Sequence, residues 1–352
     1  MPNGIIKIKN FATIHFESQV MPFITKNILN ELPAHNGNLL VEDIRHLRSL
    51  DKVSCYSRIL CSQLLNNATN INRSLIKIHN SLKPGGIFIG RVETLEHRKR
   101  RIATYANRFQ YKIIVIYEFI IKRVGPKLFG FRFLFKRLGI TKHHVLSKCE
   151  ALGRLRYCGF EIIDTRETDK YLYFIAAKNS QPLIEKPHEG ILIKIQKVGK
   201  DGRIINCYKL RTMHAYANFL HDYVLNNHEL DDNGKIVGDY RKTNWGQFLR
   251  KSWLDEIPQI LNIIKGDLSF IGLRPLSQAF LSLYPEDWRK ERTKIKPGFV
   301  PPYYADCPKT FEEIVASEKR YYYLKKKHPI TADIFYLIRV IASFVSGRAR
   351  TG

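Results

Sequence analysis

The first half of the chain alternates between extended and helical hydrophobic patterns. Residues 56–65, YSRILCSQLL, form an apolar run that predicts a strand leading into a loop. Residues 71–82 repeat Ile and Leu at the three- and four-residue spacing of an amphipathic helix. The KPGG sequence at 83–86 predicts a break, and residues 87–93, IFIGRVE, predict a buried strand. These patterns indicate a domain that contains both helices and strands.

Another helix and two more strands are predicted before residue 178. Residues 147–160 have the pattern of an amphipathic helix closed by Gly159, and residues 160–178 predict two strands around a polar turn. The order over 55–178 resembles the last part of a Rossmann-like methyltransferase, in which LKPGG leads into the fifth strand and an antiparallel hairpin closes the sheet. The glycine-rich loop that binds adenosylmethionine in such enzymes is not visible upstream. We therefore predict a degenerate, incomplete Rossmann-like domain that serves stability or interaction, with methyl transfer as the less favoured alternative.

Residues 108–140 contain two aromatic and basic stretches on either side of Gly125-Pro126. Two helices separated by a proline, with Lys and Arg beside Phe, Tyr, Ile and Val, suit a segment that lies in a membrane interface. The pattern also fits two ordinary helices that pack on the core and extend their charges into solvent. Residues 179–189 contain two prolines and mixed charge, and they predict a linker to a second domain.

The charge balance points to negatively charged partners. Fifty-eight Lys and Arg side chains outnumber 32 Asp and Glu side chains, for a formal net charge of +26. Anionic lipid or phosphorylated substrates are favoured over nucleic acid, because no zinc-finger, leucine-zipper or RNA-recognition motif accompanies the charge. The six cysteines form no C-x-x-C pair, which fits a reducing cytoplasm. No window of about 18 apolar residues is free of charge, so we expect no ordinary membrane-spanning helix.

Six short motifs follow one another from residue 190 onward. K-x-G-x-x-G begins at Lys197 with a hairpin turn, and Y-K-L-R-T-M begins at Tyr208. Residues 239–276 hold R-x-T-x-x-G-x-F-L-R-K, L-D-E-x-P-Q-x-x-N and K-G-D-x-S-x-I-G-x-R-P, and K-P-G begins at Lys296. In this order the motifs resemble those of the bacterial sugar transferases, also called polyprenyl-phosphate hexose-1-phosphate transferases. The resemblance covers most of 190–300 and a C-terminal helical tail.

Asp255 and Glu256 are expected near the start of a helix. Either Ser252 is the N-cap, with Asp255 three residues on as in a capping box, or Pro258 lies in the first turn. A carboxylate at a helix start stays ionised, as a nucleophile must, and the free N–H groups there favour phosphate. Apolar residues at core spacing follow the pair: Ile257, Ile260, Leu261 and Ile264.

The resemblance implies a two-step reaction. Asp255 attacks the sugar-bearing phosphorus of a nucleotide sugar, which in this family is a uridine diphosphate sugar, and Glu256 binds Mg²⁺. The sugar phosphate then passes to a polyprenyl phosphate lipid. Basic side chains that match family positions suit phosphate oxygens: Arg250, Arg274, Lys209 and Arg211. The non-enzymatic alternative, an inactive basic scaffold or binding protein, is disfavoured because it has no chemical need for this set.

Two departures from the family pattern affect the membrane side of this interpretation. The apolar re-entrant helix that usually precedes the position of Gly190 is replaced by a polar linker, so the anchor is missing or displaced to 108–140. The usual Thr-Gly-Leu-x-Gln-Val run is replaced by FVPPYYADCPK at 299–309.

The sequence predicts an α/β protein with an incomplete Rossmann-like domain at 1–178, a linker at 179–189, and a compact α/β sugar transferase domain with helices and short strands at 190–352. The transfer chemistry places it at the cytoplasmic face of the bacterial inner membrane, against an anionic membrane surface.

Overall fold

The computed structural model describes residues 5–7, 20, 22–24, 38–41, 54–124, 144–183, 187, 189–227, 229 and 236–348. The chain forms two compact units. Unit 1 comprises Met1–Glu189 and Met213–Arg241, and unit 2 comprises Gly190–Thr212 and Lys242–Gly352. Residues 213–241 therefore pack with unit 1, whereas the sequence places them in the domain at 190–352.

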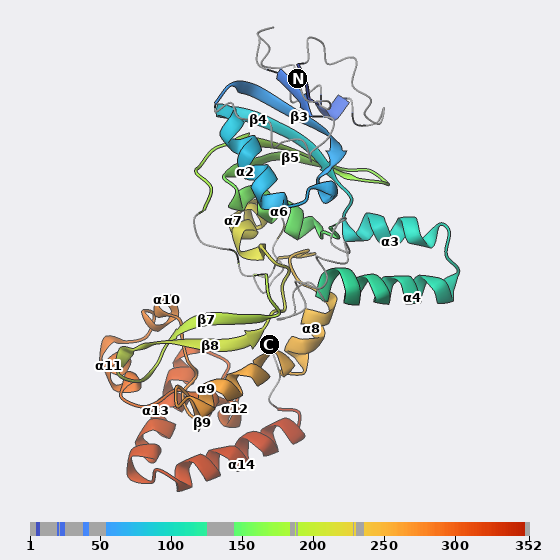
Figure 1. Ribbon diagram of the computed structural model, residues 1–352. Helices are drawn as coiled ribbons and strands as arrows, with labels where there is room; N and C mark the ends of the chain where they lie inside the picture. The colour runs from blue at the N-terminus through green and yellow to red at the C-terminus, as the bar shows by residue number, and fades with distance from the viewer. Residues whose placement is uncertain are drawn as a thin grey trace. The chain divides into compact units, whose positions relative to one another are not determined.

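Unit 1 is built on a six-stranded sheet with the order β1-β2-β3-β4-β6-β5 (Figure 1). Its strands are β1 (Ile5–Lys7), β2 (Asn38–Val41), β3 (Tyr56–Leu64), β4 (Leu82–Val92), β5 (Phe160–Glu167) and β6 (Leu172–Lys178). Neighbours β2, β3 and β4 are parallel, and the β5–β6 hairpin is antiparallel with β6 against β4. The predicted strands and closing hairpin are confirmed, and the fold is mixed α/β. The Rossmann-like assignment itself stays a prediction.

The predicted helices of unit 1 are also present. Helix α2 (Ile71–Ser81) begins at Asn70, whose side chain accepts from Arg73 N, and α6 (Lys148–Tyr157) begins with a capping box at Ser147. The predicted break at 83–86 lies inside β4: the β3–β4 register jumps there, and Gly85 has φ +70°. The pattern located the end of the helix correctly, because a bulge and a loop use the same residues.

The segment 213–241 is fastened to unit 1 through Tyr216. This residue has φ 65° and is buried beside α6, ahead of helices η8 (Ala217–Leu220) and α7 (His221–Asn227). The Tyr216 hydroxyl lies 2.6 Å from Asn72 Nδ2, 2.9 Å from Arg154 Nη1 and 2.6 Å from Glu189 Oε1. Burial of the aromatic ring with these hydrogen bonds explains why a segment from the middle of the transferase sequence belongs to unit 1.

A helical hairpin projects from the end of β4 in unit 1 (Figure 1). It consists of α3 (Leu95–Ala103) and α4 (Arg108–Glu118), and a π-helical segment, η4 (Phe119–Val124), continues α4. The first of the two helices predicted over 108–140 is therefore present. Residues 125–140 lie outside the described residues.

Unit 2 contains a β-hairpin and a set of short helices around it. The hairpin pairs β7 (Leu192–Val198) with β8 (Ile204–Leu210) through the turn η7 (Lys200–Gly202), as predicted. Two short strands, β9 (Ser269–Ile271) and β10 (Gly298–Val300), are parallel. The helices are α8 (Asn244–Lys251), η9 (Leu254–Gln259), α9 (Ile260–Ile264), α10 (Gln278–Leu281), α11 (Glu286–Thr293), α12 (Tyr303–Asp306), α13 (Phe311–Lys327) and α14 (Thr331–Val345).

The core of unit 2 lies among β9, α11, α13 and α14, with Trp288, Tyr321 and Tyr336 at its centre. A buried ion pair crosses it: Arg292 Nε lies 2.9 Å from Glu318 Oε2. Among the described residues, no helix has the length and apolar content that crossing a membrane requires.

Candidate active site

Asp255 and Glu256 lie in the first turn of η9, so the predicted position near a helix start is confirmed. The predicted capping box is wrong. Trp253, with φ 58°, precedes the helix as its N-cap, while Ser252 ends α8 and its hydroxyl donates to Phe248 O at 2.8 Å. A left-handed residue between two helices turns the chain sharply, which a capping box does not do. Pro258 lies inside η9 and not at its first turn.

Asn262 lies on α9, which directly follows the carboxylate-bearing helix η9, and holds α9 against β8. Its side chain is fully buried; Oδ1 accepts from Tyr208 N at 3.0 Å, and Nδ2 donates to Asn206 O at 2.7 Å. Nδ2 also lies 3.1 Å from Asp267 Oδ2. A buried amide with all these partners fixes the register of two elements. The Asn of the L-D-E-x-P-Q-x-x-N motif is thus a positioning residue for Asp255 and Glu256.

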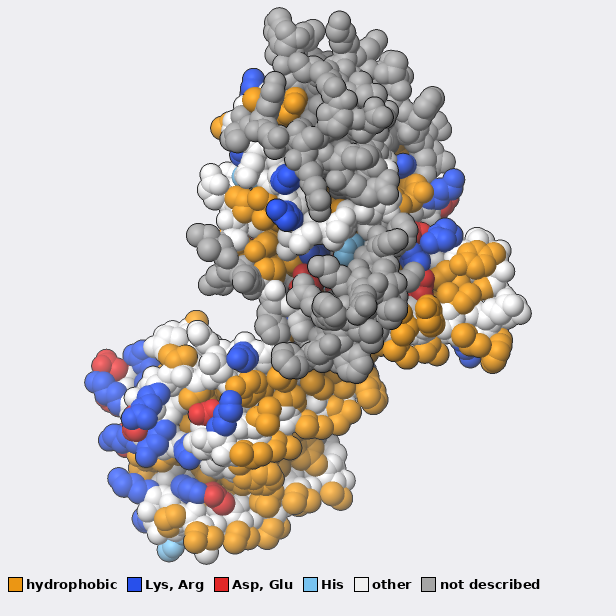
Figure 2. Space-filling view, in the orientation of Figure 1, with side chains coloured by type: hydrophobic (Ala, Val, Ile, Leu, Met, Phe, Trp, Pro, Cys, Tyr) orange, Lys and Arg blue, Asp and Glu red, His pale blue; other side chains and the backbone are white. Residues whose placement is uncertain are grey.

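The apolar residues after the Asp-Glu pair are not in the core, contrary to the prediction. Ile257, Ile260, Leu261 and Ile264 are 47%, 47%, 44% and 77% exposed. Helical spacing shows that side chains share a face, but it does not say what covers that face. Here α9 is attached to β8 through Asn262, and the apolar side chains lie on solvent-accessible surface. Figure 2 shows hydrophobic side chains gathered over a broad part of unit 2.

The Asp255 carboxyl is buried, with 9% of the residue exposed. Burial raises its pKa above the usual value, because the charged form loses hydration. The positive charge of Lys209 opposes this shift, the negative charge of Glu256 adds to it, and Arg250 opposes it. Asp255 is therefore a poorly hydrated carboxylate whose charge nearby cations only partly offset, which suits a nucleophile.

Glu256 is held from two sides. Its Oε1 forms an ion pair with the Lys209 ammonium from β8, and its Oε2 accepts from Gln259 Nε2 at 3.1 Å. The Gln of the D-E-x-P-Q motif thus orients Glu256 from one turn further along η9. The structure brings Lys209, predicted as a phosphate-binding residue, directly to the carboxylate pair.

The predicted arginines occupy three different settings. Arg250 Nε donates to Thr212 Oγ1 at 2.8 Å at the end of α8, and its charge acts on Asp255. Arg274 Nη1 donates to Tyr303 Oη at 2.9 Å, and its backbone carbonyl accepts from Arg292 Nη2 at 2.5 Å. Arg211 Nε donates to Gly190 O at 2.9 Å, so its contact is with the entry to β7.

Lys197 belongs to the same cluster and was not among the predicted site residues. Burial lowers its pKa, and the positive charges of Arg274 and Lys209 lower it further, while Cys207 and Glu256 act in the opposite direction. Lys197 is the first residue of K-x-G-x-x-G, so the motif carries the signal, although its glycines alone are enough to predict the turn. Four cations thus surround two carboxylates, and this excess of positive charge suits a diphosphate.

The donor set limits how a metal could bind. Within the described ranges, no three His, Cys, Asp or Glu side chains gather in a metal-binding group. Mg²⁺ is commonly bound by one or two carboxylates together with substrate phosphates and water. Asp255 and Glu256 fit that mode.

Burial raises the pKa of the nearby Cys207 thiol to about 11, so this cysteine is a neutral core side chain at physiological pH.

Comparisons with known proteins agree with the family that the motifs of unit 2 predict. Residues 176–347 match the family model of the bacterial sugar transferases. The chain is 37% identical over 97 residues to a UDP-galactose-lipid carrier transferase of Erwinia amylovora, covering 26% of this chain and 20% of that protein. It is 29% identical over 180 residues to a UDP-N-acetylgalactosamine-undecaprenyl-phosphate N-acetylgalactosaminephosphotransferase of Aeromonas hydrophila, covering 47% of this chain and 38% of that protein. The C-terminal half of the chain belongs to the bacterial sugar transferase family, as its motifs predicted.

The chain spans between a fifth and a half of the length of the curated relatives that it matches. Solved structures with partial likeness include the CurJ carbon methyltransferase, at 14% identity and a TM-score of 0.24 over 39% of this chain and 34% of that one. The [4+2]-cyclase SpnF matches at 14% identity and a TM-score of 0.24 over 40% and 55%. Scores of this size carry no argument about fold or activity.

Proposed function

We propose that unit 2 is a phosphoglycosyltransferase that moves a sugar 1-phosphate from a uridine diphosphate sugar to a polyprenyl phosphate. The observation that supports it best is the Lys209–Glu256 ion pair beside Asp255, together with the charges of Lys197, Arg250 and Arg274 that act on the same two carboxylates. The names of the relatives describe transfer of sugar phosphates to lipid carriers. The reaction initiates the synthesis of a surface polysaccharide or glycoconjugate.

In the first step, an Asp255 carboxylate oxygen attacks the phosphorus that bears the sugar. The bond from that phosphorus to the bridging oxygen of the diphosphate breaks, and uridine monophosphate leaves with the electron pair. Asp255 then carries the sugar phosphate as an acyl phosphate. Burial favours this attack, because a poorly hydrated carboxylate has little solvent to lose.

In the second step, an oxygen of the lipid phosphate attacks the same phosphorus. The bond to the Asp255 oxygen breaks, the carboxylate is regenerated, and a polyprenyl diphosphate sugar is released. Neither step requires a net proton transfer. Lys197, Lys209, Arg250 and Arg274 stabilise the negative charge that both steps concentrate on the phosphate oxygens.

Mg²⁺ is part of the proposal, with Glu256 as its protein ligand. When bound with the substrate, the ion would neutralise diphosphate charge and polarise the P–O bonds. Lys209 and Gln259 both contact Glu256, so they set the position of the carboxylate that would hold the ion.

A lipid acceptor requires that unit 2 meet a bilayer close to Asp255. The exposed side chains of η9 and α9 supply an apolar surface immediately after the nucleophile. Helix α14 supplies another, with Ile334, Ile338 and Ile341 exposed in one stripe. Trp253 packs on Phe344 of α14, with ring centroids 4.9 Å apart, and so joins the two surfaces. We assign this face to the cytoplasmic side of the bacterial inner membrane.

The test is transfer itself. Purified full-length protein is mixed with detergent-solubilised polyprenyl phosphate and a panel of radiolabelled uridine diphosphate sugars, and labelled lipid is extracted. We expect one sugar of the panel to give labelled lipid and free uridine monophosphate in equal amounts, and Asp255→Asn to give neither. Release of uridine monophosphate with no labelled lipid for any sugar of the panel would contradict a lipid phosphate acceptor.

A further inference from the structure

In the α3–α4 hairpin of unit 1, helix α4 presents an exposed apolar stripe. Phe109, Ile113, Ile116 and Tyr117 repeat at the spacing of one helix face and are 73%, 52%, 58% and 56% exposed. Helix α4 contains no buried residue. An amphipathic helix of a globular domain normally turns such a stripe toward the core. Figure 2 shows hydrophobic side chains covering much of the projecting hairpin.

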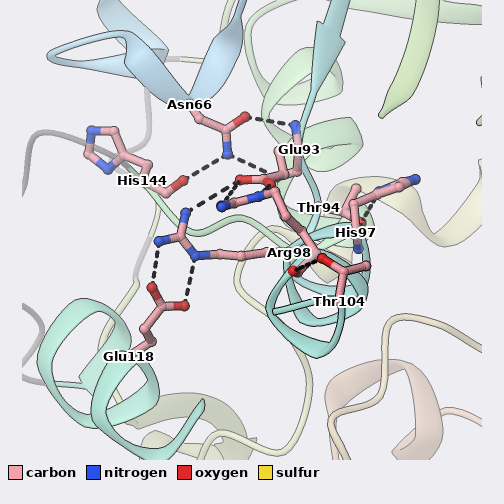
Figure 3. Close-up of polar contacts among 9 residues, drawn as sticks. Asn66, Glu93, Thr94, His97, Arg98, Thr104, Glu118 and His144 are labelled. Carbon is pink, nitrogen blue, oxygen red and sulfur yellow. Dashed lines mark hydrogen bonds and ion pairs between the residues drawn. The ribbon is translucent and has the colours of Figure 1, made fainter. Parts of the chain in front are cut away.

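An ion-pair cluster, which we call the clamp, fixes the rotation of α4. Arg98 of α3 binds both carboxylate oxygens of Glu118, with Nε–Oε2 at 2.7 Å and Nη2–Oε1 at 2.5 Å. Arg98 Nη1 also lies 3.4 Å from Glu93 Oε2 (Figure 3). Arg101 Nε lies 2.7 Å from Glu93 Oε1. The side chains of Arg98 and Glu118 are 15% and 13% exposed, so this bidentate pair is shielded from solvent.

The clamp is itself attached to the body of unit 1. Asn66 Oδ1 accepts from Glu93 N at 2.8 Å, and Asn66 Nδ2 donates to Glu93 O at 2.9 Å and His144 O at 2.8 Å (Figure 3). At about 100° per residue, Glu118 falls on the side of α4 opposite the apolar stripe. Because Arg98 holds Glu118 toward α3, the apolar stripe on the opposite side of α4 faces away from α3. The exposure of the stripe is therefore built into the hairpin.

The charges around the stripe indicate its occupant. Arg108 and Lys112 are exposed on α4 along one edge of the stripe, and Arg100 is exposed on α3. Two copies of this hairpin would bring these like charges together, and the chain as a whole carries a net charge of +26. An anionic bilayer complements the charges and accepts the apolar side chains. Tyr117 and Tyr105, both exposed, have the amphipathic rings that suit the headgroup region.

We infer that the α3–α4 hairpin is a membrane-binding arm, in which α4 lies in the plane of an anionic lipid surface with its apolar stripe inserted at the acyl boundary. This deepens the proposed function and rests on it in one respect, that the acceptor is a membrane lipid. Unit 1 then contributes its own bilayer contact, separate from the apolar face of unit 2. The clamp keeps the stripe in the orientation that insertion needs.

The test measures sedimentation of the full-length protein with vesicles of phosphatidylcholine containing increasing fractions of phosphatidylglycerol. The stripe variant is Phe109→Ser/Ile113→Ser/Ile116→Ser. We expect it to lose at least tenfold in vesicle partitioning, because apolar insertion is removed while the basic residues remain. Its control is Ile163→Ser/Leu225→Ser, which removes exposed apolar side chains of unit 1 outside the hairpin and should bind as the wild type does. A third variant, Glu118→Ala, breaks the clamp. Its vesicle partitioning should lie between that of the stripe variant and that of the control.

Three results would overturn the inference. One is a stripe variant that sediments like the wild type. Another is a wild-type protein whose sedimentation is the same with and without phosphatidylglycerol. The last is a dimer that the stripe variant alone converts to monomers, with vesicle binding unchanged, which would make the stripe a contact between copies. Transfer to detergent-solubilised polyprenyl phosphate is measured with the same protein preparations, so that failure of transfer and failure of vesicle binding can be told apart. Intact vesicle binding without any transfer would count against the proposed function alone.

Discussion

The Lys209 ammonium forms an ion pair with Glu256 Oε1 and thereby joins β8 to the helix that carries Asp255. The same lysine is the cation that most opposes the rise in the Asp255 pKa caused by burial. One side chain therefore stabilises both carboxylates before any substrate arrives. A phosphate that enters the cluster meets a lysine already positioned by Glu256.

Metal dependence should act through Glu256. We expect chelator to stop transfer and Mg²⁺ to restore it. Glu256→Gln should raise the Mg²⁺ concentration for half-maximal transfer at least tenfold, because an amide oxygen is a weaker ligand for this hard cation. The control is Glu312→Gln on the exposed face of α13. Full activity in excess chelator would remove metal from the mechanism.

Lys197 should contribute to catalysis although it stands outside the Lys-Leu-Arg-Thr-Met motif. Lys197→Met removes one of four cations around the carboxylates, and we expect kcat/KM for the nucleotide sugar to fall about tenfold or more, which corresponds to ~1.4 kcal/mol. Lys194→Met is the matched control, since Lys194 is an exposed residue three positions earlier on β7. Equal kinetics for the two variants would place Lys197 outside the site.

Asp255→Asn should stabilise the folded protein at neutral pH while it abolishes transfer. The folded-state pKa of Asp255 is raised, so above both pKa values the ionised carboxyl costs folding free energy. The amide removes that cost and should raise the unfolding temperature by ~2–4 °C for each kcal/mol relieved. The gain should shrink as pH falls through the folded-state pKa, where wild-type Asp255 becomes neutral.

Differential scanning calorimetry over a pH series measures this effect. Asp201→Asn serves as the control, because Asp201 is exposed in the η7 turn at φ 55°, a conformation that Asn also adopts. A variant at 255 that unfolds at a lower temperature than the wild type at neutral pH would show that the carboxylate is stabilised in the folded state.

Unit 1 should not bind adenosylmethionine. The sequence shows no glycine-rich loop ahead of LKPGG, and without such a loop the backbone cannot approach the cofactor closely. Isothermal titration calorimetry of the full-length protein should show no heat of binding at physiological cofactor concentrations. A micromolar affinity would revive the methyltransferase interpretation of this unit.

Local signals predicted much of the structure. Strand β4, helix α2 and the β5–β6 hairpin follow from the spacing of apolar residues and from the glycines that close them. The position of Asp255 and Glu256 at a helix start also followed from the sequence, although by a different capping residue. Trp253 in the left-handed region could not be expected, because tryptophan has no preference for that conformation. Its ring packs on Tyr304 and Phe344, which are distant in the sequence.

The remaining differences concern what covers a surface, which periodicity alone does not reveal. Ile257, Ile260 and Leu261 have core spacing but are exposed, because Asn262 and not the apolar face attaches this helix to β8. Tyr216 attaches residues 213–241 to unit 1 through Asn72 and Arg154, which lie 144 and 62 residues earlier in the chain. Contacts of that range leave no local pattern.

The central claim is that Asp255 carries the sugar phosphate during transfer. Intact-protein mass spectrometry after brief incubation with the donor sugar, without lipid acceptor, tests it most directly. We predict a mass increase equal to one sugar phosphate on the wild type, located at Asp255 by peptide mapping, absent from Asp255→Asn and discharged by polyprenyl phosphate. An unmodified wild-type protein that still converts donor to lipid product, or an Asp255→Asn variant that retains activity within tenfold of the wild type, would contradict it.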